Sequence, residues 1–177
     1  MNIIQNLDLQ IKYEMNFKKI REDTDFQKKN LYIAENEKNE LFYLILVKFS
    51  DLNEENFKKI KDFITVKNDF FLNLDFLVFR NEFSFYFAFE YHPLTFYQFL
   101  NRDAVTTSLK NKLLIAKQFI EIIEFTNNNN LSFPEYDPNM FFVVENDSGL
   151  NLKYFYNGTL SIIKVTFLRT SPHKGTG

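Results

Sequence analysis

The residues with the clearest potential for chemistry lie in the loop FPEYDPNM, which spans residues 133–140. Glu135 and Asp137 bring two carboxylates into this loop, while Pro134 and Pro138 fix its backbone and remove two amide donors. Carboxylates in a loop held between rigid elements are suited to proton transfer or to binding a hard cation. The simpler alternative is that both are solvated loop carboxylates, and the residues alone favour that alternative.

One further candidate, a lysine, stands in apolar surroundings. Lys48 ends the apolar run LFYLILVKF and lies on the same predicted strand face as Leu44 and Leu46. A lysine in that place is either a functional cation or an edge residue whose stem lies along apolar surface. The only histidines, His92 and His173, are far apart in the sequence, which argues against a histidine-based metal site.

The composition excludes several classes of function. The chain has 177 residues, no cysteine and a net charge of −2, so it offers no thiolate chemistry and no general attraction for nucleic acid or membrane surfaces. It contains no run of about 20 apolar residues and no apolar signal segment near its start. We therefore predict a soluble, cytoplasmic protein, either alone or as the cytosolic part of a longer one.

The apolar pattern predicts the elements that position these residues. Strand-like runs cover 9–15, 30–35, 41–49, 70–79 and 83–91. An amphipathic helix is predicted over 54–66, between the third and fourth of these runs. A short helix is predicted over 94–103, with Thr95 as a possible cap, and a long helix over 106–130. The long helix has apolar residues at 109, 113, 116, 120 and 123.

Around these elements, the sequence predicts connecting turns and a hairpin. The charged run 18–29 is most simply a solvated turn, and FFVV with LKYFY predicts a β-hairpin over 141–156. The pattern as a whole indicates an α+β protein with a five-stranded antiparallel sheet in its N-terminal half.

This order of motifs resembles the eukaryotic protein kinase fold over nearly the whole chain. The motifs that carry the resemblance are LILVK for the third-strand AxK element, FYFAFEYHPLTFYQFL for the hinge, FPEYDPNMFFV for HRDLKPxNIL, LKYFYNG for vKixDFG, and GTG for the later GT. The hinge stretch is most similar to the unfolded-protein sensor kinase–ribonucleases. The resemblance implies an N-lobe over 1–91 and a partial C-lobe over 92–177.

The same resemblance implies a nucleotide site. Lys48 would contact the nucleotide phosphates, and Phe89 would be the gatekeeper at the back of the site. Glu90, Tyr91 and His92 would be the hinge whose backbone faces adenine. The nucleotide-binding candidates are therefore Lys48, Glu90 and His92.

The departures from the kinase pattern remove the groups on which phosphoryl transfer depends. Glu135 replaces the catalytic aspartate and is one methylene longer, while Pro134 replaces the neighbouring arginine. Met140 and Tyr156 replace the two magnesium ligands, so we expect no metal site. Leu46 replaces the small alanine over the adenine and narrows that slot.

Two more kinase features are missing around the predicted phosphate site. The stretch REDTDFQKKN has no glycine, so its backbone cannot easily wrap phosphates. No glutamate in EENFKKIKDF stands at the position that would pair with Lys48.

We therefore predict a catalytically inactive, kinase-like domain that acts as a scaffold or regulatory module, with no cofactor. Its partner would be a protein, for example another kinase domain. The alternatives are an atypical active serine/threonine kinase that binds ATP and uses Lys48 and Glu135 with an unusual metal arrangement, or a nonfunctional truncated fragment. Because the sequence stops before the central helices of a kinase C-lobe, we also expect exposed apolar surface.

Overall fold

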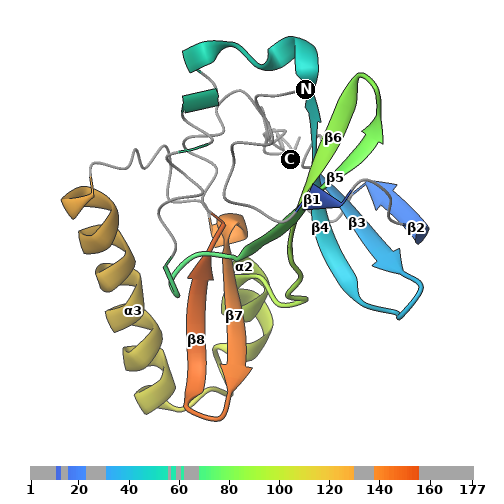
Figure 1. Cartoon of the computed structure of the whole chain (residues 1–177). Helices are drawn as coiled ribbons and strands as arrows, with labels where there is room; N and C mark the ends of the chain where they lie inside the picture. Colours follow the sequence, from blue (N-terminus) through green and yellow to red (C-terminus); the bar gives the residue numbers. More distant parts are fainter. Residues whose placement is uncertain are drawn as a thin grey trace, which may run out of the picture.

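The computed structural model describes residues 11–12, 16–22, 31–55, 57–58, 61, 68–129 and 138–155. Within them, a curled and mostly antiparallel sheet lies beside a long helix and a β-hairpin, so the chain is α+β as predicted. The sheet comes from the first half of the chain and the helix and hairpin from the second half (Figure 1).

The sheet has the strand order β1-β5-β6-β4-β3-β2 in the described part of the chain. Its antiparallel strands are β2 (Phe17–Glu22), β3 (Leu31–Asn36), β4 (Leu41–Lys48), β5 (Leu74–Asn81) and β6 (Ser84–Glu90). The short strand β1 (Ile11–Lys12) is parallel to β5. Strand β6 lies between β5 and β4, and every residue of β6 except Glu90 is buried, as its continuous apolar run indicates.

The N-terminal edge of the sheet differs from the prediction. The sequence predicts a strand over 9–15 and a turn over 18–29, whereas Phe17–Glu22 forms β2 and pairs antiparallel with β3. Of the run 9–15, the described residues Ile11–Lys12 belong to β1. The charged sequence FKKIRE forms a strand because β2 is an edge strand, where lysine is tolerated.

The sheet buries apolar side chains on both faces. On one face, Ile45 and Phe87 belong to the main core, which continues into the helix and the hairpin. On the other face, Leu44, Tyr86 and Ala88 belong to a smaller cluster. Neighbouring residues join different clusters because successive side chains of a strand point to opposite faces. The main core is therefore shared by the two predicted lobes on either side of residue 91.

Two short helical turns follow β6. Thr95 caps α2 (Phe96–Gln98): its hydroxyl accepts from the Gln98 amide at 3.1 Å, and the Gln98 side chain accepts from the Thr95 amide. The chain continues as the π-helical turn η3 (Phe99–Asp103). This confirms the short helix and its predicted cap. The helix predicted over 54–66 has helical backbone at the described residues 54–55, 57–58 and 61.

The long helix α3 (Leu109–Asn128) confirms the predicted element, but its apolar series does not mark its buried face. Leu109 is 71% exposed, Leu113 62% and Ile120 56%. The buried residues of α3 are Ile115, Gln118, Ile122 and Thr126. The helix has two apolar faces, and the face that contains Ile115 and Ile122 packs against the hairpin.

The predicted hairpin is confirmed as β7 (Phe141–Asn146) and β8 (Gly149–Tyr154), preceded by the 3-10 turn η4 (Pro138–Met140). Gly149 has a φ of 111° after the turn, a conformation that favours glycine. The outer edge of β8 is covered by α3, because the Gln118 side chain donates to the Leu150 carbonyl at 2.9 Å and accepts from the Leu152 amide at 2.6 Å. One glutamine thus extends the backbone pairing of β8.

Candidate functional site

The predicted catalytic loop lies mostly outside the described residues. Pro134, Glu135 and Asp137 fall outside them, and so does Tyr156. Met140 is described and is only 3% exposed, within the main core. Its carbonyl accepts a hydrogen bond from the Phe155 amide at 2.7 Å. The position predicted to replace a magnesium ligand thus carries a buried apolar side chain.

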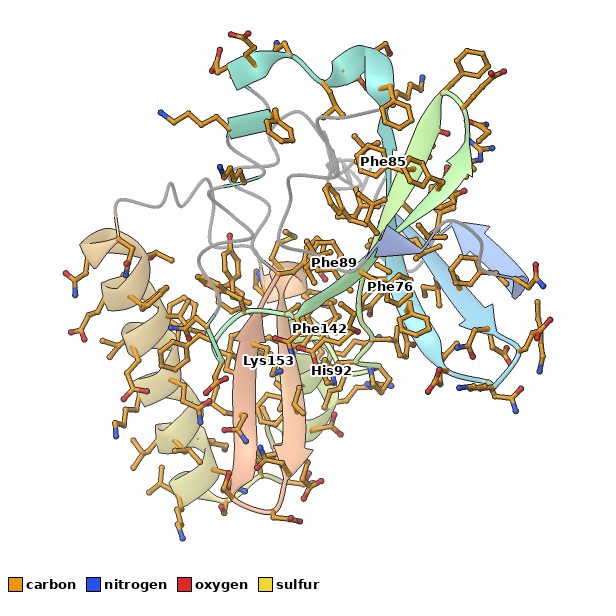
Figure 2. The ribbon with its side chains drawn as sticks, viewed as in Figure 1. Phe76, Phe85, Phe89, His92, Phe142 and Lys153 are labelled. Atoms are coloured by element: carbon orange, nitrogen blue, oxygen red, sulfur yellow. The ribbon has the colours of Figure 1, made fainter. Side chains whose placement is uncertain are left out.

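A cluster of polar side chains, Glu90, His92 and Lys153, lies where the sheet meets the hairpin. Lys153 Nζ donates to Glu90 Oε1 at 2.7 Å, and His92 Nε2 lies 2.9 Å from Glu90 Oε2. The Asn73 amide also donates to Glu90 Oε1, at 2.8 Å. Figure 2 shows His92 and Lys153 close to Phe142 at this junction. We call these three side chains the Glu90 cluster.

The Glu90 cluster and the Asn73 amide that donates to it join three segments that are far apart in the sequence. Glu90 ends β6, Lys153 lies in β8, and Asn73 directly precedes β5. The three side chains of the cluster are about one-fifth exposed, at 19–20%. The cluster therefore fixes the end of the sheet to the hairpin with charge-assisted hydrogen bonds, which are stronger than neutral ones.

The environment of Glu90 changes its acidity. Burial of the carboxyl raises its pKa, but the hydrogen bonds from His92, Lys153 and Asn73 and the charge of Lys153 lower it more. Together they bring the pKa of Glu90 from its ordinary value of 4.5 down to about 2. Glu90 is therefore held as a carboxylate rather than prepared to exchange a proton near neutral pH.

This shift predicts a pH dependence of stability. The pKa of Glu90 is lower in the folded chain than in the unfolded chain. The contribution of Glu90 to folding stability is therefore complete at a pH above its unfolded-state pKa, and it is lost as the pH falls from 4.5 toward 2. We expect a loss of about 2 kcal/mol over this range, since solvent weakens the full effect of a partly exposed group. Urea unfolding at a series of pH values measures it.

The matched variants for this measurement are Glu90→Gln and Glu82→Gln. Glu90→Gln should lower stability at neutral pH and flatten the acid limb of the curve. Glu82 lies in the exposed turn between β5 and β6, so Glu82→Gln should keep the wild-type dependence. An unchanged acid limb in Glu90→Gln would contradict the described cluster.

Two backbone groups of the segment predicted to face adenine form hydrogen bonds within the chain. The Glu90 amide donates to the Asn73 carbonyl at 3.0 Å. The Tyr43 hydroxyl donates to the His92 carbonyl, also at 3.0 Å. The Tyr43 ring packs against Tyr91 and Phe142, with ring centroids 4.9 and 5.4 Å apart. Aromatic side chains therefore pack beside this segment.

The predicted gatekeeper, Phe89, is also part of the core. It is 1% exposed, and its ring meets Phe155 edge to face with centroids 5.0 Å apart. Because the Phe89 ring is enclosed by other apolar side chains, it contributes to packing between sheet and hairpin.

Lys48 lies away from the Glu90 cluster. It is exposed and pairs with Ser84 at one end of the β4–β6 ladder, whereas Glu90 pairs with Phe42 at the other end. Six residue steps separate these pairs, or about 20 Å at the usual rise of a strand. The structure thus brings Glu90 and His92 together but not Lys48. Nucleotide binding by these three residues stays a prediction.

Lys48 lines a surface depression of about 280 Å³ at the end of β4. Leu46 and Arg80 contribute to its lining. Within the described part of the chain, Lys48 forms no ion pair with a carboxylate. This agrees with the interpretation of Lys48 as a solvated lysine at the end of a strand.

Sequence reasoning missed Lys153 and Gln118. Lys153 stands between Leu152 and Tyr154, both buried, so a lone charge within an apolar strand was the available signal. Its partner Glu90 is 63 residues away, and nothing local in the sequence connects them. Gln118 gave a similar signal, as a polar residue between Ile115 and Ile122 on one face of the predicted helix.

Comparison with known proteins gives no family. No protein-family model and no curated protein matches the chain. In the described residues, no group of three or more histidine, cysteine, aspartate or glutamate side chains could hold a metal ion. None of the described helices combines the length and apolar character needed to cross a membrane.

Proposed function

We propose that this chain is a kinase-like interaction domain that does not transfer phosphate. The order of sheet, short helix, long helix and hairpin is consistent with the kinase pattern that the sequence resembles. The observation that carries the proposal is that backbone groups of the predicted hinge form hydrogen bonds within the chain. The Glu90 amide and the His92 carbonyl already have partners in Asn73 and Tyr43.

The metal side of the predicted site supports the same proposal. At Met140, a soft thioether stands where the kinase pattern has a hard oxygen ligand. The Met140 side chain is buried in the main core and packs against other apolar side chains. Phosphoryl transfer needs metal ions that neutralise the developing charge, so a domain without their ligands would act through binding alone. Its partner, on this proposal, is another protein.

Thermal unfolding with millimolar ATP and magnesium tests the proposal. A ligand at about 100 times its Kd stabilises a protein by about 2.7 kcal/mol, which would raise the Tm by several degrees for a chain of this size. We expect ATP with magnesium to leave the Tm unchanged.

Two lysine variants make the result specific. Lys48→Ala removes the predicted phosphate contact, and Lys58→Ala removes another exposed lysine as the control. A magnesium-dependent rise in Tm that Lys48→Ala abolishes and Lys58→Ala keeps would refute the proposal. Transfer of labelled phosphate to the chain or to a general substrate would refute it equally.

A further inference from the structure

The outward face of α3 carries an apolar ridge, which we define as Leu109, Leu113, Ala116 and Ile120. Three of these side chains are more than half exposed. They are separated by four, three and four residues, so they lie on one line along the helix. The opposite face of α3 is already packed against the hairpin, so the ridge is a second apolar surface. Such a surface on a folded domain marks an interaction site.

An apolar groove of about 590 Å³ runs beside this ridge, between α3 and the α2–η3 segment. Phe96, Phe99 and Leu100 line one side, and Phe119 lines the other. Ala116 and Ile120 of the ridge also line the groove. Ridge and groove therefore form one continuous surface, with the small Ala116 at its centre.

We infer that this surface joins two copies of the chain, with their α3 helices antiparallel about a two-fold axis. In such an isologous contact the same patch on both copies must complement itself. A ridge beside a groove meets this condition, because each copy's ridge faces the other copy's groove. The inference names a partner for the proposed interaction domain and rests on that proposal for its biological meaning, but its physical basis is this surface alone.

The charges along α3 favour a second copy and fix its direction. The first half of the helix carries Lys110, Lys112 and Lys117, and the second half carries Glu121 and Glu124. In an antiparallel pair, the basic half of each helix faces the acidic half of the other. A parallel pair would place like charges together, which disfavours association.

The size of the surface sets the expected affinity. Stable interfaces bury about 1,200 Å² or more in total, and a single helix face with its groove is near that lower limit. Leu100, which lines the groove, is itself 46% exposed and adds to the apolar area. We therefore expect a reversible dimer with a Kd in the micromolar range.

Sedimentation velocity on the whole 177-residue chain, over micromolar to near-millimolar concentrations, tests the inference. The expected result is a reversible change from one chain to two. Ile120→Glu should weaken dimerisation by about 30-fold or more, since it places a charge where ridge and groove meet in the apolar contact. Phe83→Glu is the control, because Phe83 is 70% exposed in the β5–β6 turn and should leave dimerisation unchanged.

A charge exchange tests the antiparallel direction. Lys110→Glu and Glu124→Lys should each weaken dimerisation, whereas an equimolar mixture of the two variants should restore it as a mixed dimer. Far-ultraviolet circular dichroism confirms that every variant is folded. A single chain at all concentrations, association that survives Ile120→Glu, or growth beyond two chains would each overturn the inference. None of these results affects the nucleotide test, so the two proposals fail separately.

Discussion

Replacing Phe142 by alanine is expected to lower the free energy of unfolding by about 3–5 kcal/mol, the usual cost of removing a buried phenylalanine. Phe142 lies in β7 and is 1% exposed. Its ring packs against Tyr43 of β4, so it connects the hairpin to the sheet. For a chain of this length, that loss corresponds to a Tm lower by roughly 10 °C.

The control for this prediction is Phe83→Ala. Phe83 is 70% exposed, so the same change in chemistry should cost no more than about 0.5 kcal/mol. Urea unfolding followed by circular dichroism measures both variants. If Phe142→Ala were as stable as Phe83→Ala, the hairpin would not share a core with the sheet.

The second large effect is expected from Gln118→Met. Methionine nearly preserves the volume of glutamine but leaves the Leu152 amide and the Leu150 carbonyl without the hydrogen bonds they now make with Gln118. Gln118 is 8% exposed, so water reaches these groups poorly. We expect a loss of about 2–4 kcal/mol, the cost of leaving buried polar groups unsatisfied.

Lys117→Met is the matched control on the same helix. Its side chain is 72% exposed, and it loses only a surface ion pair with Glu121 at 3.5 Å. Such a pair contributes about 0.5 kcal/mol or less. Hydrogen exchange adds a local measurement, because the Leu152 amide should exchange much faster in Gln118→Met than in Lys117→Met. Equal exchange in the two variants would contradict the role of Gln118 as the edge partner of β8.

The sequence predicted those elements that local chemistry determines. The continuous apolar run of β6 is typical of a buried central strand, and Thr95 at the start of the short helix was predicted as its cap. The aromatic and β-branched runs around a turn gave the hairpin of β7 and β8. In each case a short stretch contains the whole physical reason for the structure.

Features that depend on distant partners could not be predicted in this way. Strand β2 has a charged sequence, and its strand conformation depends on pairing with β3. Helix α3 has two apolar faces, and only contact with the hairpin selects the one that contains Ile122. The candidate site shows the same limit, since Glu90 was identified but its partner Lys153 was not.

The proposed function depends most on whether the segment with Glu90 and His92, held by contacts within the chain, binds nucleotide. The most direct measurement is a titration of isotope-labelled protein with ATP and magnesium, followed by the backbone amide resonances of Glu90, His92 and Lys153. We expect these resonances not to move at any nucleotide concentration when the ionic strength is held constant. Saturable shifts at all three amides, retained in Lys58→Ala but lost in Lys48→Ala, would contradict it.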